Sequence, residues 1–399
     1  MVKIGKVKFK TDADRFCTVS NFEKRGWSRG HGADWNFYWA TVGTVKWIFS
    51  PEAGKRLSDH QIINHFPNHY ELTRKDLMVK NIKRYRRELE RDQGPLVYAN
   101  GDSVLDFIPQ TYLLPAEYTS FLDEFKRVTA GERDERKKVP WILKPSGRAQ
   151  GKGIVIIHKL HQVKKYCTPK SYSSSIGRDS HVVSRYIHRP LLVGGRKFDL
   201  RLYVLVTSFR PLRAYIHRQG FCRFCMSKYS SDSLSMSDPF VHLTNVAIQK
   251  HGEEYDERNG GKWSLESFLF YIESTRGRES CRKMQDRVEN IIFHTLQSVK
   301  HVILSDKHCF ECYGYDLLID EDLRPWLIEI NASPSLSAST VADRLLKYTL
   351  LDDILNIVIP PLYPHSHTER GGWRGGVYQD CSKEDLGGFE VLVDERKER

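Results

Sequence analysis

The sequence lacks any apolar run of the length that a membrane-spanning helix needs. Its first ten residues, MVKIGKVKFK, carry charge but no apolar signal core, so we expect no secretion and a cytoplasmic location. No internal repeat is present. A hydrophobic fraction of 40% and a charged fraction of 28% are typical of a globular chain, and 399 residues can form two or three domains around substantial cores.

Acidic residues are fewer than basic ones: the chain has 50 Asp and Glu but 62 Lys and Arg, which gives a formal net charge of +12. The excess predicts an anionic partner, which composition alone leaves open among nucleic acid, an anionic membrane, a nucleotide and an acidic protein. The motifs of nucleic-acid binders, such as a recognition helix, aromatic ribonucleoprotein strands or zinc fingers, are missing. We therefore expect neither a nucleic acid nor a membrane as the partner.

Cysteine is scarce, with eight residues, and in a reducing compartment these are expected to be free thiols. The pairs Cys222/Cys225 and Cys309/Cys312 have metal-like spacing, but neither contains the Gly or Pro that usually turns a zinc knuckle. Both pairs lie in strand-like sequence, where a spacing of three sends the sulfurs to opposite faces. Buried thiols are therefore the favoured interpretation, with a zinc site as the alternative.

The most informative segment reads YGYDLLID, a short turn and then RPWLIEINASPS, over residues 313–335. Two apolar runs with single polar interruptions are typical of paired strands. Glu329 and Asn331 are two residues apart, so they share a strand face, and the turn brings Asp316 onto the same face. Unpaired carboxylates beside an apolar layer are costly, whereas Mg²⁺ takes such oxygen ligands. These three residues predict a magnesium site; the alternative is a solvent-facing hairpin with ordinary polar alternation.

A second strand is predicted at residues 197–206 by strict alternation of polar and apolar side chains. One face carries Lys197, Asp199, Arg201 and Tyr203, and the other carries Phe198, Leu200, Leu202 and Val204. The row of positive, negative and positive groups can bind a phosphate and an anionic substrate at once. An exposed strand face with cross-strand ion pairs is the alternative.

A lysine followed by a glycine loop gives a third signal. Lys144 ends an apolar strand, and the loop SGRAQGKG that follows contains Gly151 and Gly153. The lysine can reach the α- and β-phosphates of a nucleotide while backbone N–H groups approach them at the glycines. The loop matches neither the Walker nor the Rossmann fingerprint, so a plain hairpin turn is an equally good interpretation.

Two further strand ends have polar residues that would suit a nucleotide. Residues 184–187 could pair their backbone with an adenine edge, although nothing in the four letters requires it. Thr244 and Asn245 would suit ribose or phosphate contacts, and ordinary capping explains them equally well.

In this order, the lysine strand, the glycine loop, the KFDLR strand and the D…ExN hairpin resemble the ATP-grasp ligases. The motifs KFDLRLYV, HLTN and WLIEINASPS are similar to those of the tubulin tyrosine ligase-like family, over roughly residues 20 to 360. NFEKRGW, NHYELTRKDLMVKN, GGRKFDLR and FECYGYD resemble its glutamylase branch, whose catalytic subunit works inside a multi-subunit complex.

The resemblance implies an α/β (α+β) fold of the ATP-grasp type. It implies a small N-terminal α/β domain at 1–85, a central domain at 86–190, a C-terminal domain with the magnesium site at 191–365, and a flexible tail at 366–399. The central and C-terminal domains would enclose ATP between them.

The resemblance also implies roles for matching residues. ATP would be held by Lys144, Gln150, Gly151, Ser184, Arg185, Tyr186, Ile187, Lys197, Phe198, Asp199, Thr244 and Asn245. Mg²⁺ would be held by Asp316, Glu329 and Asn331, and free L-glutamate by Arg223 and Lys262. Arg201 would stabilise the transferring phosphoryl group, while Lys197 and Lys144 offset the charge that moves.

The implied reaction is the ATP-dependent addition of glutamate to side-chain carboxylates in the acidic C-terminal tails of tubulin, through an acyl phosphate. It implies accessory subunits of a polyglutamylase complex and a location on the cytoskeleton, at a cilium or flagellum axoneme or basal body. The long basic extension of self-sufficient glutamylases is missing, so autonomous microtubule binding is not expected. The alternatives are a glycine or tyrosine ligase of the same family, or a non-catalytic scaffold that binds tubulin.

Overall fold

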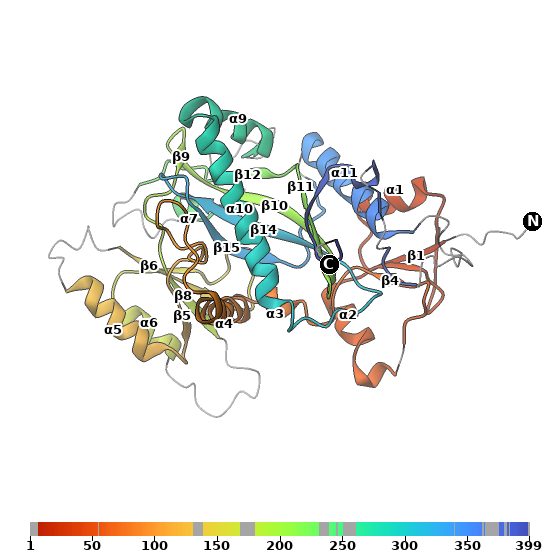
Figure 1. The fold of residues 1–399 in the computed structure, drawn as a ribbon, viewed down its shortest axis with the longest axis horizontal. Helices are drawn as coiled ribbons and strands as arrows, with labels where there is room; N and C mark the ends of the chain where they lie inside the picture. Colours follow the sequence, from red (N-terminus) through yellow and green to blue (C-terminus); the bar gives the residue numbers. More distant parts are fainter. Residues whose placement is uncertain are drawn as a thin grey trace, which may run out of the picture.

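The structure is a computed structural model that describes residues 7–54, 56–130, 139–167, 180–230, 239–244, 246–249, 261–338, 340–360, 363, 375–378, 381–382 and 384–397. Over these residues the strands form three sheets with helices against their faces, as the α/β expectation required (Figure 1). In the same ranges, no helix is long and apolar enough to cross a membrane.

The first sheet is parallel and has the strand order β2-β1-β3-β4. Its strands are β1 (Lys8–Thr11), β2 (Ser28–Arg29), β3 (Phe37–Trp39) and β4 (Ile62–Ile63). The helices that accompany it are α1 (Phe16–Lys24), α2 (Val42–Ile48), the 3₁₀ turn Pro51–Ala53 and, from much later in the chain, α11 (Val341–Val358). Phe9 and Phe37 pack on Phe22 of α1, and the same cluster includes Leu350 and Ile354 of α11. The beginning and the end of the chain therefore share one core.

The second sheet is antiparallel and has the order β5-β8-β6-β7. Its strands are β5 (Thr111–Leu114), β6 (Trp141–Pro145), β7 (Val155–Ile157) and β8 (His181–Arg185), and its helices are α5 (Tyr118–Thr129) and α6 (His161–Cys167). Phe121 of α5 packs edge-on against Trp141 of β6, and Val163 of α6 joins the same cluster. Both helices thus cover one face and leave the other face available to the rest of the molecule.

The third sheet has eight strands and contains the hairpin and the alternating strand that the sequence singles out. Its strands are β9 (Leu192–Val193), β10 (Arg196–Phe209), β11 (Leu212–His217), β12 (Phe221–Phe224), β13 (Lys262–Ser264), β14 (Glu311–Ile319), β15 (Pro325–Asn331) and β16 (Phe389–Asp394). The path β13-β12-β10-β11-β16 is extended by β14, which pairs with β10 and with β15. The predicted strand at 197–206 and the predicted hairpin are both confirmed.

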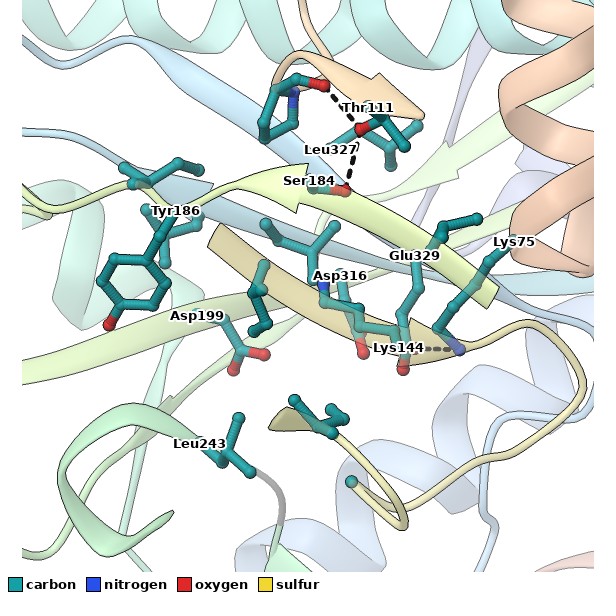
Figure 2. A pocket seen from close by; sticks show the side chains of 18 of the residues that line it. Lys75, Thr111, Lys144, Ser184, Tyr186, Asp199, Leu243, Asp316, Leu327 and Glu329 are labelled. Carbon is teal, nitrogen blue, oxygen red and sulfur yellow. Dashed lines mark hydrogen bonds and ion pairs between the residues drawn. The ribbon is translucent and has the colours of Figure 1, made fainter. Parts of the chain in front are cut away.

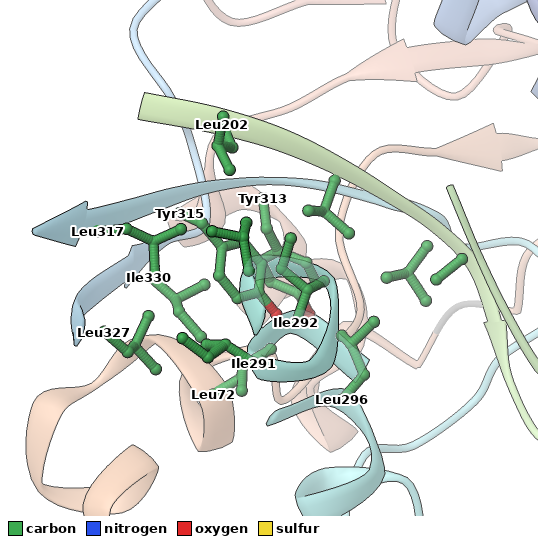
Figure 3. Packing of buried hydrophobic residues seen from close by; sticks show 14 of the residues in the cluster. Leu72, Leu202, Ile291, Ile292, Leu296, Tyr313, Tyr315, Leu317, Leu327 and Ile330 are labelled. Atoms are coloured by element: carbon green, nitrogen blue, oxygen red, sulfur yellow. The ribbon is translucent and has the colours of Figure 1, made fainter. Parts of the chain in front are cut away.

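Helices cover both faces of this sheet. They are α3 (Tyr70–Thr73), α4 (Lys75–Gln93), α7 (Pro239–His242), α8 (Val246–Gln249), α9 (Leu265–Arg276) and α10 (Arg278–Val299), in addition to α11 and a 3₁₀ turn at Glu384–Leu386. The apolar side chains of β10 and β14 pack on α10, with Leu202, Tyr315 and Leu317 facing Ile292 and its neighbours (Figure 3). The opposite face, with Tyr203, joins the cluster that contains α11. The alternation in β10 thereby separates two cores.

The sequence also predicts a helix through residues 77–91, from an apolar stripe that consists of Met78, Ile82, Tyr85 and Leu89. Helix α4 differs from this prediction mainly at its beginning. The sequence places the first residue near Thr73 with Asp76 as a capping partner, but the helix begins at Lys75 after Arg74, which makes no side-chain cap. Asp76 instead accepts hydrogen bonds from Arg74 and Ser180. The apolar stripe is as predicted, because Met78 and Ile82 are buried and Tyr85 and Leu89 pack against the same core.

The four cysteines with metal-like spacing are buried thiols, as the sequence favours. All four of these side chains are buried and none of them forms a disulfide: Cys222, Cys225, Cys309 and Cys312. Burial raises the pKa of the Cys222 and Cys309 thiols well above the ordinary value, so these groups stay protonated near neutral pH. Low reactivity follows for both.

The three sheets use strands from residues 8–63, 111–185 and 192–394, so the predicted boundaries near 85 and 190 fall between sheets. The division into domains itself stays a prediction. A flexible tail at 366–399 is wrong for residues 389–394, because β16 pairs with β11 along the edge of the large sheet. Phe389 and Val393 are buried, and Asp394 forms an ion pair with Arg213. The preceding residues are rich in glycine and charge, a composition typical of a loop, so the sequence did not predict this short strand.

Truncation of Phe389 to Ala is expected to lower the free energy of unfolding by about 3–5 kcal/mol, because it opens a cavity in the core shared with α11. Val391 lies in the same strand with an exposed side chain, so Val391→Ala is the matched control and should change the unfolding free energy by about 0.5 kcal/mol or less. Urea unfolding of both variants measures the difference. Equal, small effects would mean that β16 contributes no packing.

Candidate active site

One pocket lies between the second sheet and the large sheet, and both sheets supply its walls (Figure 2). Its apolar lining includes Met78, Val79, Ile108, Ile142, Ile154, Val182, Leu243, Leu318 and Leu327. Its charged lining includes Lys75, Lys144, Arg148, Lys197, Asp199, Arg223, Asp316 and Glu329. A pocket with apolar walls and a cluster of charges suits a ligand that combines a flat ring with anionic groups.

The polar face of β10 supplies Lys197 and Asp199 to this pocket. The Lys197 ammonium is buried, donates to the Tyr186 hydroxyl at 2.9 Å and to the His242 carbonyl at 3.1 Å, and lies over the Tyr186 ring. Burial lowers the pKa of Lys197 despite these contacts. Both of these hydrogen-bond acceptors are neutral. The buried ammonium is therefore well placed to bind an anionic ligand.

Arg201 and Arg223 hold the carboxylate of Asp316 from two strands. Arg201 donates to Asp316 at 2.5 and 3.0 Å, and Arg223 approaches it at 2.7 Å. Arg223 also donates to Asp199 at 2.8 Å. Although burial acts to raise the pKa of the Asp316 carboxyl, the two guanidinium groups lower it well below the ordinary value. Asp316 is therefore a carboxylate at any physiological pH.

The three residues predicted to hold magnesium come together as the strand register requires. Asp316 pairs directly with Glu329 across the hairpin, and Asn331 donates to Asp316 at 3.3 Å and to Glu329 at 3.5 Å. The solvent-facing alternative is wrong, because Asp316 is 1% exposed. The two carboxylates and the carboxamide of Asn331 thus meet at one place. With the carboxamide turned so that its oxygen faces the carboxylates, they form a donor set that fits Mg²⁺, which also takes ligands from phosphate and water.

Lys75 belongs to this site although the sequence did not predict it. Its ammonium lies 2.9 Å from Glu329 and donates to the Arg148 carbonyl at 3.2 Å. Lys75 is the first residue of α4, where a cation is disfavoured by the positive end of the helix dipole. A cation at this unfavourable end of a helix was the signal available in the sequence, and it indicates a nearby anion without identifying Glu329.

Lys144 projects from β6 into the same pocket, close to the carboxylate of Glu329. Burial lowers the pKa of its ammonium from 10.5 to about 8, an effect that Glu329 partly opposes and Lys75 and Lys197 reinforce. Near pH 8 this side chain is thus divided between its charged and neutral forms. A bound polyphosphate would favour the charged form and raise the pKa again.

We therefore expect nucleotide binding to take up protons at roughly pH 8 to 9, and nucleotide affinity to fall as pH rises through that range. Titration calorimetry in buffers of different ionisation enthalpy measures the protons taken up. In Lys144→Arg the guanidinium stays charged, so proton uptake should decrease and the affinity should depend less on pH. Unchanged uptake in that variant would assign the proton to another group.

The segment 184–187 lines the pocket with all four of its residues. Ser184 is fixed by a 2.8 Å hydrogen bond to Thr111. The backbone N–H groups of Arg185 and Tyr186 already donate to the carbonyls of residues 110 and 140, so these two groups are not available for an adenine edge. Thr244 also lines the pocket, whereas Asn245 lies outside the described residues.

Two residues assigned to ATP do not reach the pocket. Gln150 has a positive φ of 61° and an exposed side chain, while the neighbouring Gly151 does line the pocket. Phe198 lies on the opposite face of β10 and packs against Phe224 and Phe268. Strand alternation decides the second case, since Lys197 and Asp199 take the pocket face.

Arg223 and Lys262, the residues expected to hold glutamate, face one another in the register of β12 and β13. Arg223 belongs to the pocket, but Lys262 lies to one side of it and forms an ion pair with Asp343 at 3.1 Å. The Lys262 ammonium also lies over the ring of Phe221. Their joint role as a glutamate site stays a prediction.

Residues 53–367 match the tubulin-tyrosine ligase family. The chain is 48% identical over 403 residues to the Tetrahymena thermophila protein named "Probable alpha-tubulin polyglutamylase Ttll1", covering 99% of this chain and 94% of that one. It is 43% identical to the bovine "Probable tubulin polyglutamylase TTLL9" (82% and 73% covered) and 34% identical to the human "Tubulin polyglutamylase TTLL5" (82% and 24% covered). The protein is thus an ATP-dependent ligase. It belongs to the tubulin-tyrosine ligase family.

Proposed function

We propose that this chain is the catalytic chain of a tubulin polyglutamylase, which uses ATP to attach glutamate to the side-chain carboxylates of glutamates in tubulin tails. The observation that carries the proposal is the meeting of Asp316 and Glu329 beside Lys144 and Lys197 in one pocket. Asn331 is hydrogen-bonded to both of these carboxylates. Relatives named as tubulin polyglutamylases support the choice of substrate.

Asp316, Glu329 and Asn331 would hold Mg²⁺ through two carboxylates and, once the Asn331 carboxamide turns, its oxygen, which are ligand types that fit that ion. When bound, the ion would neutralise phosphate charge and orient the terminal phosphate. Lys75 occupies one side of Glu329 and would remain as a neighbouring cation for the phosphates. The apolar walls formed by residues such as Ile142 and Leu318 would receive the adenine ring, and the segment 184–187 would border it.

The chemistry needs positioning and charge neutralisation rather than a protein nucleophile. An acceptor carboxylate oxygen would take the γ-phosphoryl group of ATP and release ADP. The amine of free glutamate would then attack the acyl carbon, form the amide and release phosphate and a proton. Lys144, Lys197 and Arg201 would offset the charge that moves between the oxygens in these two steps.

The amino acid that is added is the finer part of the proposal. Arg223 and Lys262 would provide two cations in adjacent strands, which suits glutamate better than glycine or tyrosine. Competition among labelled glutamate, glycine and tyrosine separates these candidates. Preferential incorporation of glycine or tyrosine would contradict the assignment of these residues.

The acceptor would be an acidic tubulin tail, which fits the net charge of +12 and predicts a salt-sensitive association rate. We further propose accessory subunits and a location on the cytoskeleton, at a cilium or flagellum axoneme or basal body.

The decisive experiment incubates the full chain with Mg-ATP, labelled glutamate and tubulin, with and without cell extract. Mass spectrometry of the tails is expected to find added glutamates that require ATP, and a requirement for extract would indicate accessory subunits. If the chain neither adds glutamate nor binds ATP in the presence of magnesium, it is a scaffold and the proposal is wrong.

A further inference from the structure

A second pocket, separate from the nucleotide site, forms a groove between α9 and α11. Its walls come from α9, the middle of α10, the beginning of α11 and the ends of β11, β12 and β13. Figure 1 shows the positions of α9, α11, β11 and β12, and residues of all four elements line the groove. None of the residues assigned to ATP or Mg²⁺ lines it, whereas Lys262, one of the two residues assigned to glutamate, does.

Large apolar side chains are exposed along this groove. Phe270 on α9 is 73% exposed, and Val341 and Leu345, one turn apart on α11, are 81% and 66% exposed. Trp263 of β13 adds a ring that is 39% exposed. Apolar residues scattered singly over a surface are ordinary, but four that line one groove are typical of a site where another molecule binds.

The groove is acidic, although the whole chain is basic. Five carboxylates and two cations line it, and one of the cations, Lys262, is bound to Asp343. Within the described residues, Glu266 and Glu289 have no ion-pair partner. Burial and the neighbouring Asp286 and Glu390 raise the pKa of Glu289, which indicates uncompensated negative charge.

We infer that this groove docks a segment of a partner protein that is apolar on one face and rich in Lys and Arg beside it. Leu- or Phe-type side chains would cover Phe270, Val341 and Leu345, and the basic residues would pair with Glu266 and Glu289. The inference concerns binding and is independent of the proposed reaction.

The negative charge of the groove argues against two other occupants, the acceptor tail and a neighbouring segment of this chain. A glutamate-rich acceptor tail would be repelled by the carboxylates that line the groove. Residues 250–260, which precede β13 in the sequence, carry four acidic and two basic side chains and are disfavoured for the same reason. A partner of opposite charge is therefore the occupant that the groove fits.

Fluorescence anisotropy with the full chain and three synthetic helical peptides of about 18 residues tests the inference. One peptide has Leu on one face and Lys beside it, the second replaces Lys by Glu, and the third keeps Lys but replaces Leu by Ser. The Leu/Lys peptide should bind at least about tenfold more tightly than the other two. Phe270→Glu should weaken it by at least about tenfold, and Glu266→Lys/Glu289→Lys should reverse the preference toward the Leu/Glu peptide.

Matched controls change the same residue types away from the groove. Leu304→Glu and Glu279→Lys lie on other exposed surfaces and should leave peptide binding unchanged, and all variants should retain Mg-ATP binding. If the affinity for the Leu/Lys peptide is unchanged in Phe270→Glu or in the charge-reversed variant, the inference is wrong. A doubled mass in light scattering that Phe270→Glu abolishes also overturns it, because the occupant would then be a second copy of the chain.

Discussion

Replacement of Glu329 by Gln is expected to reduce ATP-dependent glutamate incorporation by at least about 100-fold. The change removes one negative charge from the hairpin face on which Asp316 and Asn331 also lie, and it replaces an anionic ligand for Mg²⁺ by a weaker neutral one. It keeps the size of the side chain and an oxygen that can accept from Lys75. The fold should therefore persist while Mg-ATP binding, measured by calorimetry, weakens.

Glu321, in the turn of the same hairpin, provides the matched control. Its carboxylate is partly exposed and pairs with Arg189 on the surface, an arrangement that contributes little to stability. Glu321→Gln should keep activity and magnesium dependence. Retained activity in Glu329→Gln, with normal magnesium dependence, would show that the hairpin does not hold the metal.

Replacement of Arg223 by Gln is expected to lower the free energy of unfolding by about 3–5 kcal/mol and to abolish activity. The guanidinium is buried between Asp199 and Asp316, so its loss leaves two buried carboxylates with one cation fewer. Chemical unfolding gives the stability, and labelled-glutamate incorporation gives the activity. Because Arg223 helps to lower the pKa of the Asp316 carboxyl, the loss of stability should grow as pH rises through the range in which that carboxyl ionises and should then level off.

The double variant Asp199→Asn/Arg223→Gln separates the structural role of Arg223 from its role toward substrate. Removal of the second charge should restore a large part of the stability, because one buried carboxylate no longer lacks its partner. Activity should stay lost. Arg278→Gln, which removes an exposed partner of Glu273, should have an effect below about 0.5 kcal/mol. An active double variant would contradict any contact between Arg223 and the amino acid.

The sequence predicted the parts of this site that depend on short-range regularity. A strand alternates its side chains and a tight hairpin fixes its own register, so the shared face of Asp316, Glu329 and Asn331 followed from spacing alone. The same alternation placed Lys197, Asp199 and Arg201 together on β10.

The contacts that escaped prediction join segments that are distant in the sequence. The sequence around Lys75 does not indicate that the first turn of α4 contacts the hairpin at Glu329, because that contact depends on how the helix packs against the large sheet. The pairing of β16 with β11 likewise depends on tertiary packing, which the sequence of so short a strand does not determine. Gln150 and Phe198 were assigned by resemblance, and local backbone geometry directs both side chains away from the pocket.

The core that joins the first sheet to α11 has a consequence during synthesis of the protein. Phe9, Phe22 and Phe37 leave the ribosome early, but their packing partners Leu350 and Ile354 follow only about 300 residues later, which at typical elongation rates is roughly 15–60 s. During that interval the aromatic side chains lack their native cover. Cellular production of this chain should accordingly depend on chaperones that shield nascent apolar surface.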